Sequence, residues 1–84
     1  MVGNISLSLT DLEKFEIDSK WFYKNIDLLR EKNFTGKFVA IKNREVIASD
    51  NNVNNIVKSV EASGVNPSYI VIEFIYPKEA VVLF

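Results

Sequence analysis

The stretch that most constrains this chain is residues 34–49, which have the pattern of a β-hairpin. Two apolar runs, residues 38–41 and 46–48, flank a short polar segment. Asn tolerates a positive φ, so Asn43-Arg44 can form a two-residue primed turn between the two runs. The sequence therefore predicts two antiparallel strands joined at this turn.

The predicted turn sets the register of the hairpin and the two faces of its strands. It places Ile41 opposite Val46, and side chains then alternate between the faces of the sheet. One face is wholly apolar and is assigned to the core; its members are Val39, Ile41, Val46 and Ala48. The other face carries Phe38, Ala40 and Ile47, with Lys42 and Glu45 at its tip. Because the first strand is apolar on both faces, we expect it to be central in the sheet.

Helical patterns lie before and after the hairpin. Before it, Thr10-Asp-Leu-Glu13 has the form of a capping box and predicts a short helix or turn through about Phe15. Asp18 or Ser19 can cap a further helix over residues 20–32. After the hairpin, apolar residues at i, i+3, i+4 and i+7 predict an amphipathic helix that Asp50–Asn52 begin and Gly64 ends; they are Val53, Ile56, Val57 and Val60.

The last third of the chain predicts two more strands. Residues 69–76 are rich in β-branched and aromatic side chains, Pro77-Lys78 suits a turn, and residues 80–84 are again apolar. The expected fold is α+β: a two-layer sandwich with element order α-β-β-α-β-β and a four-stranded antiparallel sheet of order 2-1-3-4. The right-handed crossover rule favours placing the helix after the hairpin on the Val39/Ile41 face.

The 84 residues suffice for one domain, with residues 1–18 expected as an N-terminal arm and short helical turn, and residues 19–84 as the α+β domain. The sequence has no Cys and no His, so it lacks thiolate chemistry and the commonest general base and metal ligand. No apolar run approaches the ~20 residues of a membrane span, and the N-terminus does not resemble a signal peptide. We expect a cytoplasmic protein with no cofactor, no metal and no enzymatic activity.

Charge is unevenly distributed along the chain. Residues 1–19 contain a group of four acidic residues, Asp11, Glu13, Glu16 and Asp18. Their spacing could suit a hard cation, but the more ordinary interpretation is that they lie at the starts of helices, where the helix dipole favours negative charge. Residues 20–44 hold seven basic residues against two acidic ones. This basic region suggests nucleic-acid binding as the alternative function, through Lys20, Lys24, Lys37, Lys42 and Arg44.

Surplus apolar residues favour a protein partner or self-association. Ile5, Leu7 and Leu9 alternate with polar residues, as in an extended segment that adds to a sheet edge. The second hairpin face is either an interface or is covered within the monomer. The predicted function is therefore a non-catalytic protein–protein interaction module, self-associating or a small accessory subunit. Its candidate binding residues are Ile5, Leu7, Leu9, Phe38, Ile47, Lys42 and Arg44.

Residues 19–84 also resemble a known family. The run Phe34-x-Gly-Lys-Phe-Val-Ala-Ile, followed by Glu45-Val-Ile-Ala-Ser and by Gly64 and Pro77, is similar to a family of small uncharacterised prokaryotic proteins, mainly archaeal, known as a domain of unknown function. The resemblance implies the hairpin, a helix ending in Gly and an isoleucine-rich strand. It assigns no catalytic residue and does not cover the first eighteen residues.

Overall fold

A three-stranded antiparallel sheet of order β2-β1-β3 forms the middle layer of the protein. The structure, a computed structural model, describes residues 9–80. Its elements are α1 (Asp11–Lys24), α2 (Ile26–Glu31), β1 (Phe38–Ile41), β2 (Val46–Asp50), α3 (Val53–Ala62), η1 (Pro67–Tyr69), β3 (Val71–Phe74) and η2 (Lys78–Ala80), where η denotes a 3-10 helix. As predicted, the apolar strand β1 is central.

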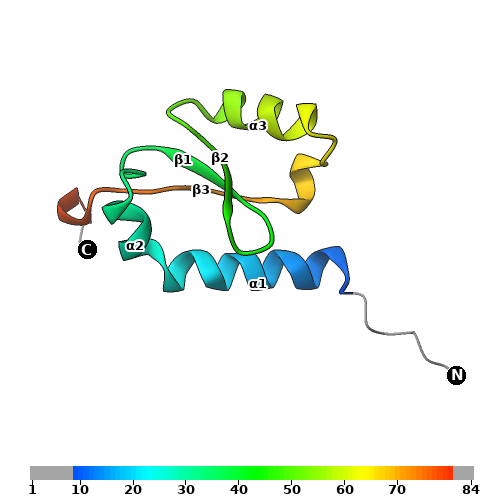
Figure 1. The fold of residues 1–84 in the computed structure, drawn as a ribbon, viewed down its shortest axis with the longest axis horizontal. Helices are drawn as coiled ribbons and strands as arrows, with labels where there is room; N and C mark the ends of the chain where they lie inside the picture. The colour runs from blue at the N-terminus through cyan, green and yellow to red at the C-terminus, as the bar shows by residue number, and fades with distance from the viewer. Residues whose placement is uncertain (1–8, 81–84) are drawn as a thin grey trace, which may run out of the picture.

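Helices cover both faces of the sheet (Figure 1). On one face α1 and α2 pack against a buried cluster made of Phe22, Leu29, Val39, Ile41, Val71 and Ile75. On the other face α3 packs against a second cluster made of Ala40, Ile56, Val60 and Ile70. The alternation of side chains along β1 thus supplies two cores, and the architecture has three layers.

The expected two-layer sandwich with a four-stranded sheet is wrong. The described residues form three strands, and α3 covers the Ala40 face because α1 and α2 occupy the Val39/Ile41 face. Where the fourth strand was expected, Lys78–Ala80 form a 3-10 helix, and residues 81–84 lie outside the described range. β3 ends at Phe74, and Pro77, which offers no amide hydrogen to a sheet, cannot extend its ladder.

The hairpin turn is confirmed, but the register beyond it differs from the prediction. Asn43 and Arg44 both have positive φ, 52° and 59°, and Lys42 and Glu45 exchange backbone hydrogen bonds across the turn. The pairing then shifts: Ile41 faces Val46, whereas Ala40 faces Ala48 rather than Ile47. Ile47 is therefore the extra residue of a β-bulge.

This bulge explains why the predicted core face of β2 is wrong. One inserted residue reverses the direction of every side chain that follows it. Val46 packs with the α1-side core as expected, but Ala48 packs beneath α3 with the other core. The β propensities of the residues in this short strand do not indicate such an insertion.

A single helix, α1, joins the short helix expected through about Phe15 to the first part of the helix expected over residues 20–32. It begins with the predicted capping box, in which the Thr10 side chain accepts from the Glu13 amide and the Glu13 side chain accepts from the Thr10 amide. The helix runs through residues 18 and 19, where the domain boundary was expected. It stops at Asn25, whose side-chain amide donates to the Trp21 carbonyl, and α2 follows.

Candidate interaction surface at the edge of the sheet

Strand β3 forms one edge of the sheet. The Ile75 amide donates to the Lys37 carbonyl (2.9 Å) and the Gly36 amide donates to the Ile75 carbonyl (2.7 Å), so the backbone polar groups of Ile75 point toward β1. Because these directions alternate along a strand, Ile72 and Phe74 direct their N–H and C=O groups away from β1. Within residues 9–80, no strand pairs with this outer side of β3.

The most exposed large apolar side chains of the described residues surround this edge. Their exposed fractions are 69% for Leu12, 60% for Tyr23, 59% for Tyr76 and 53% for Tyr69, whereas the next is 46%. Tyr69 immediately precedes the strand region and Tyr76 follows it. The edge therefore combines unpaired backbone groups with apolar side chains.

Helix α1 contributes one side of this surface. Leu12 and Phe15 share a shallow hollow with Tyr69 and Ser68 of η1. Farther along α1, the Tyr23 hydroxyl donates to the Glu73 carboxylate over 3.1 Å. Leu12 and Tyr23 are eleven residues apart, which is three helical turns, so both face the β3 side.

Glu73 is the charged group at the middle of the edge strand. Across β1 its neighbour is the buried Val39, so no charge on β1 opposes it. Its negative charge, the hydrogen bond from Tyr23 and slight burial together raise the pKa of the Tyr23 phenol above its ordinary value. The hydrogen-bond partner of the Glu73 carboxylate is thus a tyrosine of α1.

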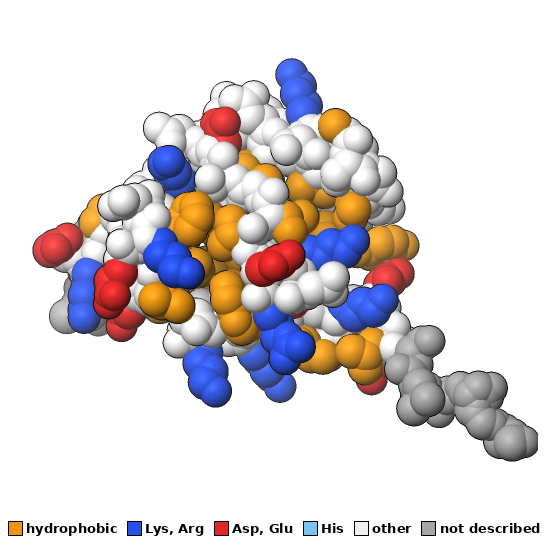
Figure 2. Space-filling model, in the orientation of Figure 1, with side chains coloured by type: hydrophobic (Ala, Val, Ile, Leu, Met, Phe, Trp, Pro, Cys, Tyr) orange, Lys and Arg blue, Asp and Glu red, His pale blue; other side chains and the backbone are white. Residues whose placement is uncertain are grey.

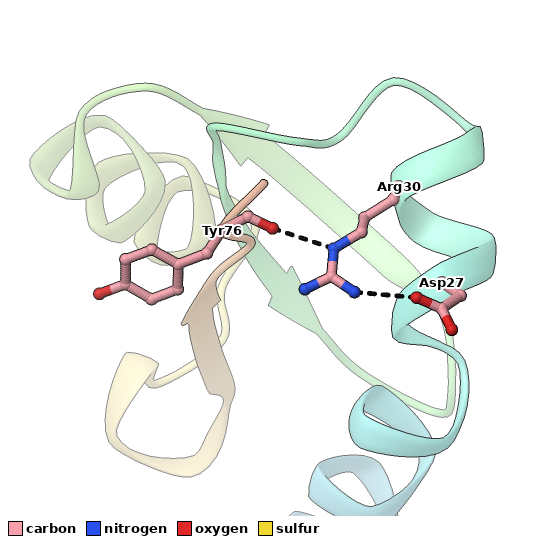
Figure 3. A network of polar contacts seen from close by, with 3 residues as sticks. All are labelled: Asp27, Arg30 and Tyr76. Atoms are coloured by element: carbon pink, nitrogen blue, oxygen red, sulfur yellow. Dashed lines mark hydrogen bonds and ion pairs between the residues drawn. The ribbon is translucent and has the colours of Figure 1, made fainter. Parts of the chain in front are cut away.

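An aromatic group defines the other face of the edge. The Phe74 ring lies between Phe38 and Tyr76, with centroid distances of 4.9 and 4.7 Å and edge-to-face geometry. Figure 3 shows how the end of the strand is held, with Arg30 of α2 placed between Asp27 and Tyr76. The Arg30 guanidinium donates to the Tyr76 carbonyl (2.9 Å) and to Asp27 (2.8 Å), and the Tyr76 ring points away from it.

A second surface lies at the hairpin turn, where Asp18 connects α1 to the sheet. The Asp18 carboxylate accepts from the Arg44 amide (2.8 Å) and the Asn43 amide (3.2 Å), and Asp18 is only 6% exposed. Shallow hollows on both sides of the turn bring together Lys14, Lys42 and Arg44. The backbone of the turn is thus satisfied by Asp18, and its surroundings combine these three basic residues with the acidic Asp11.

The structure separates the binding residues predicted from the sequence. Ile5 and Leu7 lie outside the described residues. Leu9 is exposed near Arg44, in a hollow beside the turn. Phe38 is half-buried against the α3 core and contacts Phe74, while Ile47 is exposed at the bulge beside Lys42. Of these residues, Phe38 of the central strand contacts the β3 edge, through Phe74.

The predicted charge clusters are also dispersed. Glu13 serves the helix cap, where the Thr10 amide and hydroxyl lower its pKa, and Asp18 serves the turn. Within residues 9–80 no three acidic side chains are arranged to hold a metal ion. Figure 2 shows basic side chains around much of the face in view, several of them together along its lower edge, and acidic side chains among the others.

Sequence reasoning missed the main members of both surfaces. Asp18 was interpreted as a helix cap, because nothing in a sequence shows that a helix will pass a distant turn. Tyr69, Glu73 and Tyr76 carried a usable signal: two tyrosines bracket an isoleucine-rich strand interrupted by one charge. That pattern is typical of a strand that is not covered on all sides.

None of the described helices has both the length and the apolar character required to cross a membrane.

Comparison with known proteins gives one match: a model of a family of unknown function, DUF5678, matches residues 30–78, more than half of the chain. The match includes the whole sheet and α3 but not α1. Neither a curated protein nor a solved structure shows significant similarity to the chain.

Proposed function

The chain belongs to the DUF5678 family, whose function is unknown, and we propose that it is a non-catalytic protein–protein interaction module, self-associating or an accessory subunit of a larger complex. One observation carries the proposal: within residues 9–80, the four most exposed large apolar side chains all surround the outer edge of β3. An uncovered sheet edge is a template for binding another chain, and natural proteins usually blunt such edges. The absence of His and Cys from the sequence agrees with a role in binding.

The test is capture of a binding partner by the purified full-length protein, together with sedimentation at micromolar concentration. The informative variant is Leu12→Ser combined with Tyr76→Ser, which removes two exposed apolar side chains beside β3. The matched control is Leu28→Ser combined with Val53→Ser, because these residues are also exposed but lie on α2 and α3. We expect the wild-type protein to associate with a partner or with itself. The Leu12/Tyr76 variant should have an affinity at least tenfold lower, and the control variant should keep the wild-type affinity. A protein that stays monomeric and captures nothing would contradict the proposal.

The basic hairpin turn supports nucleic-acid binding as a second candidate, because α1 adds Lys14 to Lys42 and Arg44 there. Contacts with phosphates predict binding that weakens steeply with salt. Replacing these three residues by Gln should abolish binding, whereas Lys24→Gln with Lys32→Gln should change it less. An absence of binding to single- or double-stranded DNA and RNA at ~50 mM salt would remove this candidate.

A further inference from the structure

We propose that the partner of the β3 edge is an extended peptide segment with an apolar–basic–apolar pattern, added as a fourth strand with its basic residue opposite Glu73. This inference rests on the interaction function proposed above and specifies its partner. In strand addition of this kind, backbone hydrogen bonds provide the affinity, and pockets for alternate side chains of the added strand provide the specificity. The edge supplies both, as the following contacts show.

The backbone of β3 offers a short, regular docking site. Ile72 and Phe74 point their N–H and C=O groups outward, and β3 pairs with β1 in unbroken register from Val71 to Phe74. An added strand can therefore form four hydrogen bonds with these two residues. The partner residue between them lies directly opposite Glu73.

The side chains around the edge determine which residues fit. On the α3 side, the partner residues that bond Ile72 and Phe74 meet a surface of Ile72, Phe74 and Tyr76, which favours apolar side chains. On the α1 side, the central partner residue meets Glu73, whose Oε2 already accepts from Tyr23. A second carboxylate, Glu16, lies on the same α1 face as Leu12 and Tyr23, because these residues are four and seven positions apart. Lys or Arg at the central position complements both charges.

A second copy of this chain fits the edge poorly. Antiparallel self-pairing through Ile72 and Phe74 of both copies places Glu73 directly opposite Glu73, and like charges in that position are destabilising. The neighbouring registers would recruit Ile70 or Tyr76 instead. The Ile70 amide already donates to the Pro67 carbonyl (3.1 Å), and the Tyr76 carbonyl already accepts from Arg30 (2.9 Å).

Three synthetic peptides with identical polar flanks test the proposal against the wild-type protein. Their central residues are Ile-Lys-Ile, Ile-Glu-Ile and Ser-Lys-Ser, and binding is followed by backbone-amide NMR and hydrogen exchange. We expect the Ile-Lys-Ile peptide to bind about two- to thirty-fold more tightly than the Ile-Glu-Ile peptide, because one gains an attractive cross-strand charge pair and the other a repulsive one. The Ser-Lys-Ser peptide should bind more weakly than the Ile-Lys-Ile peptide.

The exchange pattern is the most specific readout. On binding, the Ile72 and Phe74 amides should become protected, while the Glu73 and Ile75 amides, already directed at β1, should change little. Glu73→Lys should reverse the charge preference of the peptides, whereas Glu61→Lys, the same change on exposed α3, should leave it intact. The wild-type peptide series remains decisive if Glu73→Lys fails to fold.

Equal affinities for the three peptides, or protection that does not alternate along β3, would overturn the inference. So would concentration-dependent dimerisation that protects Ile72 and Phe74 without peptide, because the occupant would then be a second copy. If the Leu12/Tyr76 variant loses a captured partner but no peptide binds, the interaction function stands and the extended-strand partner is wrong.

Discussion

The two edges of the sheet differ in how they end. On the β2 side, the bulge at Ile47 breaks the regular ladder, α3 packs over the strand, and the strand ends at Asp50, whose carboxylate accepts from the Asn52 amide (2.8 Å) and the Asn55 side chain (3.2 Å). On the β3 side, the register is regular and exposed tyrosines stand at both ends.

Bulges, short strands and charges are the devices by which proteins prevent unwanted strand pairing. Of these devices the bulge distinguishes β2, while the described residues show an unbroken ladder at β3, which carries the single charge of Glu73. The contrast favours β3 over β2 as the side that receives a partner. It also explains why the hairpin, the most recognisable part of the sequence, is not the main candidate surface.

The largest expected effect on stability comes from the central strand β1, which pairs with both edge strands. Ile41→Ala should cost about 2–5 kcal/mol of unfolding free energy, because Ile41 is fully buried in the α1-side core. Lys42→Ala, one residue along at the end of the hairpin, should cost well under ~1 kcal/mol. Denaturant unfolding of both variants measures the difference. Comparable costs would mean that β1 is not the shared, buried strand described here.

The next largest effect should fall on the β2 side alone. Asp18→Ala removes the charged acceptor of the Asn43 and Arg44 amides and should cost about 1.5–3 kcal/mol, the range for a hydrogen bond to a charged group. Asp11→Ala, an exposed acidic residue on the same helix, is the control and should cost less.

Hydrogen exchange locates the effect of Asp18→Ala. We expect faster exchange at the Asn43 and Arg44 amides and in β2, with little change in β3. Equal loss of protection in both edge strands would show that the turn contact supports the whole sheet and would remove the contrast between the edges.

The sequence predicts local features of this fold better than their arrangement. The Thr10–Glu13 capping box, the Asn43-Arg44 turn and the helix end at Gly64, which has a φ of 84°, each depend on neighbouring residues and are confirmed. The bulge at Ile47 and the face covered by α3 depend on packing between distant segments. Their prediction failed for that reason, and the sheet was assigned one core instead of two.

The candidate surface was partly predictable on the same grounds. The apolar strand with Glu73 in its middle was visible in the sequence, and its partial exposure could be suspected. The contributions of Leu12 and Tyr23 could not be predicted from the sequence, because they depend on α1 running continuously past β3. The expected role of Ile5 and Leu7 concerns residues outside the described range and stays a prediction.

The smallest expected effects are titrations, and they have opposite signs at the two edges. Tyr23 has a raised pKa, caused first by the charge of Glu73, so its hydrogen bond stabilises the fold fully below pH ~10, the ordinary tyrosine value, and is lost as the pH rises through the higher folded value. Asp50 has a lowered pKa, caused first by the Asn52 amide and then by Asn55. Its contribution is present above pH ~4 and is lost as the pH falls through the lower folded value.

Acid should therefore loosen the start of α3 beside β2, and base should loosen the contact between α1 and β3. NMR titration of the Asp50 carboxyl carbon and the Tyr23 ring carbon measures the two transitions separately. Glu73→Gln removes the negative charge while keeping an acceptor, so it should lower the Tyr23 pKa toward its ordinary value and leave the Asp50 titration unchanged. Since Glu73 is also the residue expected to receive a basic side chain, the Ile-Lys-Ile peptide should lower the Tyr23 pKa in the wild-type protein by partly neutralising that carboxylate. A Tyr23 titration insensitive to Glu73→Gln would show that the two side chains do not meet in solution, and the α1 side of the edge would then lack its polar contact.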